Sequence, residues 1–235
     1  MSYLLLVRHG ESRWNIANKF TGWADVPLTE NGMQEAVRVA LQIKTLRLDV
    51  AFSSHLERAH QTLHSILSVQ HCTGVMQHDH SHELAGRTLR YLVRLGENEI
   101  PIYTNWLLNE RHYGALQGMD KNVAQGRYGH NKVLAWRRGY DARPPRGESL
   151  ADVYARAVPY FKKTILSEIK KGRNVLVVAH GNTLRAIIKY IEEISDDDIS
   201  NLEIAPAHPF IYKYEDGQFS KTKNGYSFDR PILWK

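Results

Sequence analysis

The chain has 235 residues, 43% hydrophobic and 24% charged, with a formal net charge of +6, a composition typical of a globular protein that buries a sizeable core. No apolar run reaches the roughly 18 residues of a bilayer span, and no leader pattern is recognisable, so we expect neither a membrane protein nor an exported one. The single cysteine, Cys72, excludes a disulfide within the chain and favours a reducing, cytoplasmic location.

The first predicted element is a strand over residues 4–7, Leu-Leu-Leu-Val, which ends at Arg8, His9 and Gly10. Four consecutive aliphatic residues are typical of a strand that is buried on both faces of a parallel sheet. Ligands bind at the carboxyl edge of such sheets, so we expect Arg8 and His9 to project into a crevice there. A glycine at position 10 lets the backbone turn tightly beside the ligand.

A helix that Thr29 caps and that ends near Arg47 is predicted next, followed by a short strand at 50–53. Residues 54–57, Ser-His-Leu-Glu, have the spacing of a capping box, which places Arg58 in the first turn of another helix. Free backbone N–H groups at that end of a helix, together with a guanidinium, favour phosphate binding. The alternative is an exposed arginine on an amphipathic helix.

The stretch 71–100 is rich in histidine and then continues with helical spacing up to Gly96; its histidines are His71, His78, His80 and His82. Clustered histidines can bind a transition metal. Their alternation, without a cysteine or a second ligand pair of defined spacing, favours an exposed loop that leads to a surface helix, so we predict no metal site. Residues 100–103, Ile-Pro-Ile-Tyr, are predicted to be an edge strand because proline cannot donate to a central ladder.

Residues 108–118, Leu-Asn-Glu-Arg-His-Tyr-Gly-Ala-Leu-Gln-Gly, bring acidic, basic and phenolic groups together between apolar and glycine positions. A glutamate in a partly desolvated crevice can exchange a proton with a substrate hydroxyl, which makes Glu110 a candidate general acid and base. The alternative is that Glu110 and Arg111 form a surface ion pair.

A long helix is predicted after Ser149, which forms a capping box with Asp152, and Pro159 is expected to kink or divide it. A second buried strand at 175–179 then ends in His-Gly, as the first does. Two neighbouring strands of this kind would bring two imidazole rings face to face across one pocket. After a last strand at 210–214, we expect a loosely structured tail from about residue 218.

The segments 8–12, Arg-His-Gly-Glu-Ser, and 179–182, Ala-His-Gly-Asn, resemble the signature of the histidine phosphatase superfamily, whose members carry a phosphoryl group on the first histidine. Residues 108–118, with 20–23 and 136–138, closely resemble the cofactor-dependent phosphoglycerate mutases. The resemblance implies a single α/β domain over 1–235, a three-layer sandwich with a mostly parallel central sheet flanked by helices. It further implies an isomerase that interconverts 3-phosphoglycerate and 2-phosphoglycerate in glycolysis and gluconeogenesis, primed by 2,3-bisphosphoglycerate and using no metal.

The same resemblance assigns roles to individual residues. His9 is expected to become phosphohistidine, with flanking cations that disfavour its protonated form. Arg8, Arg58 and His180 are expected to stabilise the transferring phosphoryl group, and Glu110 is expected to move the hydroxyl proton. The full set expected to bind substrate is Arg8, His9, Gly10, Glu11, Ser12, Asn15, Thr21, Gly22, Arg58, Glu110, Arg111, Tyr113, Lys121, Arg137, Arg138, Gly181 and Asn182.

Some segments depart from the pattern of that family. The stretch 71–100 is interpreted as an insertion, the connector 138–148 is short, and residues 205–209, Ala-Pro-Ala-His-Pro, replace an expected Pro-Thr-Gly segment. The expected partners are small phosphorylated three-carbon acids and a second copy of the chain in a homodimer.

Two other functions stay open. The first is a phosphomonoester phosphatase on the same fold, and the second is a non-catalytic binder of anions or nucleic acid. Basic residues recur singly rather than in blocks of five or six, which favours a compact polyanion over nucleic acid.

Overall fold

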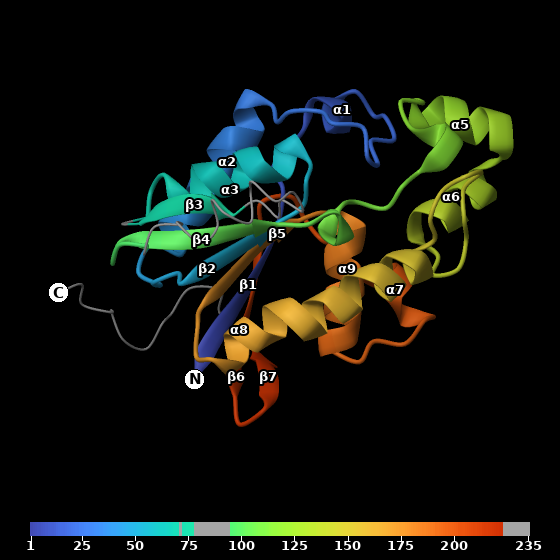
Figure 1. Ribbon diagram of the computed structural model, residues 1–235. Coiled ribbons are helices and arrows are strands. Elements are labelled where there is room, and N and C mark those ends of the chain that lie inside the picture. Colours follow the sequence, from blue (N-terminus) through green and yellow to red (C-terminus); the bar gives the residue numbers. More distant parts are fainter. Residues whose placement is uncertain (71, 78–94, 223–235) are drawn as a thin grey trace, which may run out of the picture.

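The computed structural model describes residues 1–70, 72–77 and 95–222. All strands in this part of the chain belong to one sheet in the order β3-β4-β2-β5-β1-β6-β7 (Figure 1). The first five of these strands run parallel, and β6 is antiparallel to β1 and to β7. The strands are β1 (Ser2–Arg8), β2 (Val50–Ser53), β3 (Thr73–Gln77), β4 (Glu99–Thr104), β5 (Val175–Ala179), β6 (Pro209–Glu215) and β7 (Gln218–Lys221).

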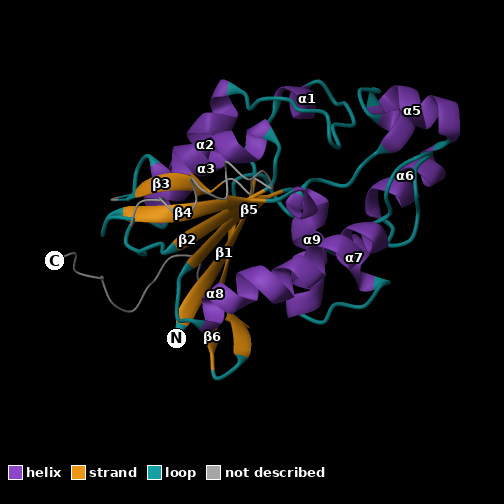
Figure 2. Cartoon of the chain, in the orientation of Figure 1, coloured by secondary structure: helices purple, strands orange, loops and turns teal. Residues whose placement is uncertain are grey.

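Helices cover both faces of the sheet and make the predicted three-layer α/β sandwich (Figure 2). One face carries α2 (Glu30–Gln42) and α3 (Glu57–Leu67). The other carries α7 (Leu150–Tyr160), α8 (Leu166–Lys170) and α9 (Gly181–Ile191). Three further helices, α1 (Arg13–Ile16), α5 (Lys121–Tyr128) and α6 (His130–Arg138), lie beyond the end of the sheet where β1 ends (Figure 1).

The period of two along β1 explains how a continuous apolar run serves both layers. Leu5 and Val7 pack with α2 and α3, whereas Leu4 and Leu6 pack with α9 and the segment after α7. All four side chains are fully buried. Because successive strand residues point to opposite faces, a strand without polar positions has to lie between two covered faces. The sequence prediction of a buried parallel strand is therefore confirmed.

Several predicted helix ends are also observed. Thr29 caps α2 through Oγ1, which accepts a hydrogen bond from Gly32 N at 3.0 Å, although α2 ends at Gln42 and not near Arg47. Ser149 and Asp152 form the capping box of α7. Pro159 lies in the last turn of α7 and is followed by a π-helical turn, Phe161–Ile165. The ring of a proline removes one helical N–H, which accounts for the altered winding there.

The prediction of an edge strand at 100–103 is wrong, because β4 lies between β3 and β2. Pro101 is paired with Val75 of β3, and the pairing with β2 begins only at Ile102. The ladder with β2 therefore does not require an N–H from the proline.

Two strands were not predicted. β3 takes the edge position next to β4, and β7 lies in the segment that we expected to be loosely structured from about residue 218. β7 pairs with β6 and packs Phe219 against Tyr214 at a centroid distance of 4.8 Å. Residues 71 and 78–94 of the predicted insertion, with most of the predicted surface helix and all four histidines, lie outside the described residues, as does the tail beyond residue 222.

Candidate active site

A cavity of about 420 Å³ lies at the carboxyl ends of β1 and β5, the edge at which ligands bind in open α/β sheets. The first residues of α9 and residues of α5 and α6 also line it. Among its lining residues are Arg8, His9, Asn15, Thr21, Gly22, Arg58, Glu110, Tyr113, Lys121, Arg137, Arg138, Gly181 and Asn182, all of which the sequence predicted.

His9 follows β1 directly and is held in one orientation. Its backbone N–H donates to Ala179 O at 3.0 Å, and its ring Nδ1 lies 2.7 Å from Gly10 O. A carbonyl oxygen can only accept, so Nδ1 must carry the proton of the neutral ring and Nε2 must carry the lone pair. Nε2 in turn accepts from Arg58 Nε at 3.3 Å. The ring thus presents a nucleophilic nitrogen beside a guanidinium.

The second histidine lies next to the first because β1 and β5 are neighbours, with Arg8 in register with Ala179. The ring centroids of His9 and His180 are 5.1 Å apart. His180 is fully buried, and its Nε2 is hydrogen-bonded to Ser54 Oγ at 2.7 Å. The prediction that the two imidazole rings meet at one site is confirmed.

Burial and neighbouring cations keep both rings neutral. Burial is the main reason why the pKa of His9 lies well below its usual range. The positive charges of Arg58 and Arg8 lower this pKa further. Burial and the charge of Arg58 do the same to the pKa of His180. Desolvation and a nearby positive charge both disfavour an imidazolium ion. The predicted effect of Arg8 on His9 is therefore present, though burial is larger.

Ser54 does not cap α3 as the sequence suggested. The residue at the N-cap is Leu56, and Ser54 Oγ instead accepts from Leu56 N at 3.1 Å while it contacts His180. A buried imidazole nitrogen requires a hydrogen-bonding partner, and the hydroxyl supplies it. Arg58 nevertheless lies in the first turn of α3, as predicted.

The Arg58 side chain is 1% exposed, so the alternative of a surface arginine is wrong. Its Nη2 donates to Gly22 O at 2.8 Å and its Nη1 donates to Ala24 O at 3.0 Å. Burial lowers the pKa of Arg58 to about 10, which leaves it charged at neutral pH. Arg8 donates through Nη1 to Ile204 O at 2.7 Å. Both guanidinium groups are thus fixed by backbone carbonyls before any anion arrives.

Glu110 is also buried, at 8% exposure, and is not part of a surface ion pair with Arg111. Its Oε1 accepts from Arg111 N at 2.8 Å, from Asn182 Nδ2 at 3.0 Å and from Asn182 N at 3.2 Å. Within the described residues no donor reaches Oε2, so this oxygen is the one available to a substrate hydroxyl. Arg111 is fully buried beneath the site and donates to Tyr113 OH and to Arg137 O.

The segment that carries Glu110 is held by Arg156 from α7. Arg156 donates to Leu107 O at 2.7 Å and to the carbonyls of Asn109 and Glu110 at 3.0 Å. Its Nε donates to Glu148 Oε1 at 2.8 Å. Trp23 Nε1 donates to Glu110 O from the opposite loop. The residues around Glu110 have no regular secondary structure that would hold the carboxylate in place. These hydrogen bonds fix its position instead.

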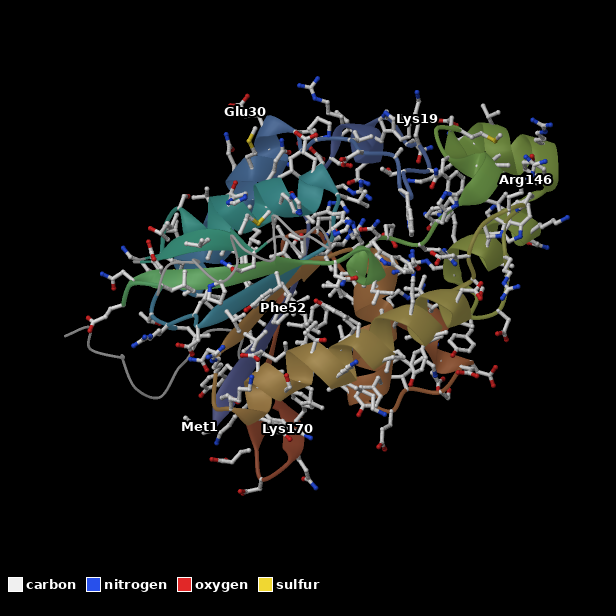
Figure 3. The ribbon with its side chains drawn as sticks, in the orientation of Figure 1. Met1, Lys19, Glu30, Phe52, Arg146 and Lys170 are labelled. Atoms are coloured by element: carbon white, nitrogen blue, oxygen red, sulfur yellow. The ribbon has the colours of Figure 1, made fainter. Side chains whose placement is uncertain are left out.

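Further cations face the cavity from α5 and α6. Lys121 is the first residue of α5, and Arg137 and Arg138 end α6. Burial lowers the pKa of Lys121, and the charges of Arg137 and Arg8 add to this because a nearby positive charge disfavours the ammonium form. Figure 3 shows many nitrogen-tipped side chains between the sheet and these two helices.

Five predicted residues do not line the cavity, and four of them support residues that do. Gly10 O orients His9, Ser12 Oγ donates to Asn15 Oδ1 at 2.9 Å, and Arg111 and His180 lie behind the surface. Glu11 faces α2, where its Oε1 accepts from Thr29 Oγ1 at 2.8 Å. The prediction that Glu11 contacts substrate is therefore not supported by its position.

The sequence analysis missed several lining residues, namely Lys19, Phe20, Arg185 and the segment 202–206. Arg185 carried a signal, because it follows Asn182 by three residues on a helix that begins at the site. Its Nη1 donates to Asn182 Oδ1 at 3.2 Å. The segment 202–206 carried none, since it comes close to the cavity only through the return of the chain to β6.

Comparison with known proteins identifies the family. Residues 4–85 and 85–225 match the model of the histidine phosphatase superfamily, branch 1. The chain belongs to this superfamily. A protein of Methanosarcina acetivorans named 2,3-bisphosphoglycerate-dependent phosphoglycerate mutase is 46% identical, in a match that covers 93% of this chain and 94% of that one. A protein of the same name from Methanococcus vannielii is 41% identical and covers 99% of this chain and 100% of its own.

Solved structures agree with the fold of this chain. YhfR of Bacillus stearothermophilus superposes with a TM-score of 0.75 at 24% identity, covering 97% of this chain and 98% of its own. A mycobacterial glucosyl-3-phosphoglycerate phosphatase, in complex with VO3, gives a TM-score of 0.74 at 22% identity, covering 97% and 100%.

Two further findings concern only the described part of the chain. No three His, Cys, Asp or Glu side chains there are grouped as metal ligands. The helices there also lack the length and apolar character that a bilayer span needs.

Proposed function

We propose that this member of the histidine phosphatase superfamily is an isomerase that interconverts 3-phosphoglycerate and 2-phosphoglycerate, the reaction used in glycolysis and gluconeogenesis. The observation that carries the proposal is the charge of the cavity. Arg8 and Arg58 flank His9, and a second group of cations, Lys121, Arg137 and Arg138, faces the same cavity from outside the sheet. A mutase needs the second group to hold a bisphosphate while it reorients, whereas a phosphatase does not. The names of the Methanosarcina and Methanococcus relatives agree with this assignment.

His9 is the proposed nucleophile. The lone pair of Nε2 attacks the phosphorus, the bond from phosphorus to the substrate oxygen breaks, and the phosphoryl group moves to the ring. Gly10 O retains the proton on Nδ1, so that the ring becomes a cation only as the new bond forms. Arg8 and Arg58 stabilise the charge on the phosphoryl oxygens, which is the main contribution that a protein makes to this loose transition state.

Glu110 is the proposed acid and base. Its Oε2 takes a proton from the substrate hydroxyl that attacks phosphohistidine, as the bond from phosphorus to Nε2 breaks, and returns that proton to the ester oxygen from which phosphorus departs when a phosphoryl group moves back to His9. Asn182 holds the other oxygen of the carboxylate. Lys121, Arg137 and Arg138 would hold the remaining anionic group, so that the intermediate turns within the cavity instead of leaving.

The residues present fit 2,3-bisphosphoglycerate as the primer, because anions at both ends of that molecule would meet arginine. It supplies the first phosphoryl group to His9. Arg8 and Arg58 would bind one phosphate, and Arg137 and Arg138 would bind the groups beyond it. A homodimer and a cytoplasmic location belong to the same proposal; the second rests on the single cysteine.

The test is intact-mass measurement after incubation with 2,3-bisphosphoglycerate. The wild type should gain one phosphoryl group and His9→Ala should gain none. A parallel assay follows 3-phosphoglycerate and separates its isomer from inorganic phosphate. Isomer in large excess over phosphate supports the mutase, while phosphate as the main product would replace it with the phosphatase. If the wild type gains no mass and converts no substrate, the remaining function is that of a non-catalytic binding protein.

A further inference from the structure

One cation of the cavity already has a carboxylate partner. Arg138 Nη2 forms an ion pair with Glu203 Oε1, and both residues line the cavity. No other basic side chain of the cavity lining has a carboxylate oxygen within 4.0 Å in the described part of the chain. These side chains are those of Arg8, Lys19, Arg58, Lys121, Arg137 and Arg185. The pair therefore distinguishes Arg138 from the cations around it.

Backbone contacts fix both partners of the pair. On one side, Arg8 Nη1 donates to Ile204 O at 2.7 Å, and Ala207 N donates to Arg8 O at 3.0 Å, which anchors the segment that carries Glu203. On the other side, Arg185 Nη2 donates to Arg138 O at 3.0 Å and to Ile199 O at 2.6 Å, which ties the end of α6 to the turn before Glu203. The chain thus brings this carboxylate to the arginine without help from a ligand.

The Glu203 side chain is 74% exposed and that of Arg138 is 37% exposed. An ion pair with this exposure is weak, since water solvates both charges and salt screens them. Glu203 can therefore turn into solvent at a small cost when a stronger anion approaches. A phosphate or a rigidly held carboxylate of a ligand is such an anion, because it is presented inside a cavity already rich in positive charge.

We propose that Glu203 is a specificity-determining residue whose carboxylate occupies Arg138 in the free protein and is displaced by the second anionic group of a substrate. This inference rests on the proposed function, because it takes Arg138 as part of the distal anion site. A ligand with one anionic group cannot displace Glu203 and leaves Arg138 neutralised. A ligand with two anionic groups exchanges one ion pair for a better one. The carboxylate therefore acts as an internal competitor that lowers the affinity for every ligand that must reach Arg138.

The test compares Glu203→Gln with Glu215→Gln. Glu215 is also exposed and paired with a lysine, at 2.7 Å from Lys213 Nζ, but lies on β6 and does not line the cavity. Both variants remove one negative charge from the surface. The dissociation constants for 3-phosphoglycerate, which has a phosphate and a carboxylate, and for glycerol 3-phosphate, which has only the phosphate, are measured by calorimetry at low and high salt.

At low salt, Glu203→Gln should bind 3-phosphoglycerate about threefold more tightly than the wild type, in keeping with the strength of an exposed ion pair. Its affinity for glycerol 3-phosphate, and both affinities of Glu215→Gln, should stay at the wild-type value. The gain should disappear near 1 M salt, where the screening length is about 3 Å. Equal or weaker binding of 3-phosphoglycerate by Glu203→Gln overturns the inference, as does an equal gain in Glu215→Gln or for glycerol 3-phosphate.

Failure of this inference and failure of the proposed function give different results. If the wild type isomerises 3-phosphoglycerate and Glu203→Gln binds it with unchanged affinity, the mutase assignment stands and the role of Glu203 is rejected. If the wild type does not isomerise 3-phosphoglycerate, the mutase assignment is rejected. The two binding measurements still decide whether Glu203 competes for Arg138. Thermal unfolding of the three proteins checks that each is folded, which an exposed substitution should not disturb.

Discussion

Asn182 donates two hydrogen bonds to a single oxygen of Glu110, one from its side chain at 3.0 Å and one from its backbone at 3.2 Å. The first residues of α9 thereby hold a carboxylate from a loop that lies 72 positions earlier in the chain. Residues of α9 also follow His180 directly. One helix terminus therefore fixes both the candidate acid and base and the residue behind the nucleophile.

Replacing Glu110 with glutamine should lower kcat for isomerisation by a factor of about 10² to 10⁴, the usual contribution of a general acid and base. The amide keeps the shape and can still accept from Asn182, so the cavity should stay intact. Steady-state isomerisation and unfolding temperature are the measurements. Glu30→Gln, a change at an exposed position of α2, is the matched control and should behave as the wild type. Activity of Glu110→Gln within threefold of the wild type would remove Glu110 from the mechanism.

Ser54→Ala should lower kcat about tenfold while KM changes less. The substitution removes the hydroxyl that lies 2.7 Å from His180 Nε2, and a lost buried hydrogen bond costs about 1–1.5 kcal/mol. The effect should appear in the rate of phosphorylation of His9, measured by rapid quench. Ser53→Ala is the control, because Ser53 is equally buried but donates to Val178 O at 3.1 Å, away from the rings. Equal losses in both variants would show that packing alone, and not the contact with His180, is responsible.

The buried histidines predict how stability depends on pH. The pKa of His9 and that of His180 are both held below the ordinary value by burial and by Arg58. A histidine in the unfolded chain titrates near pH 6.5. Below that pH the unfolded chain therefore binds more protons than the folded chain does. The stabilising contribution is complete above about pH 6.5 and is lost as the pH falls from there toward the lower folded values.

Urea unfolding between pH 5 and 7 checks this dependence. His9→Asn should reduce the slope of unfolding free energy against pH by up to about 1.4 kcal/mol per pH unit, the value for one proton. His130→Asn changes an exposed ring and should leave the slope as it is. An unchanged slope in His9→Asn would mean that His9 binds protons equally in the folded and the unfolded chain at these pH values.

Gly10→Ala should destabilise the protein by about 2 kcal/mol and displace His9. A Cβ at position 10 would lie 2.3 Å from Gly32 O on α2, and a backbone carbonyl within a helix has little room to move. Gly126→Ala, in the interior of α5 with nothing within 4 Å of an added Cβ, should instead stabilise by up to about 1 kcal/mol. Urea unfolding measures both. A Gly10→Ala protein as stable as the wild type would show that β1 and α2 can separate at no cost.

Sequence patterns identified the elements whose physics is local. The aliphatic runs before His9 and His180 required buried strands, because a strand with no polar positions has to be covered on both faces. The capping boxes and the helix cap at Thr29 were also readable, except at Ser54, where the spacing matched but the hydroxyl was used by His180. Local spacing cannot show that a distant side chain competes for the same oxygen.

The sequence alone indicated the groups of the proposed chemistry: two histidines at strand ends, an arginine in the first turn of a helix and a glutamate in the segment 108–118. Only the tertiary structure decided which strands are neighbours, that β4 is internal, that Glu11 faces α2, and that Glu203 reaches Arg138. The physical reason is that side-chain type and periodicity follow from neighbouring residues, whereas strand order and ion pairing depend on where packing returns segments far apart in the chain.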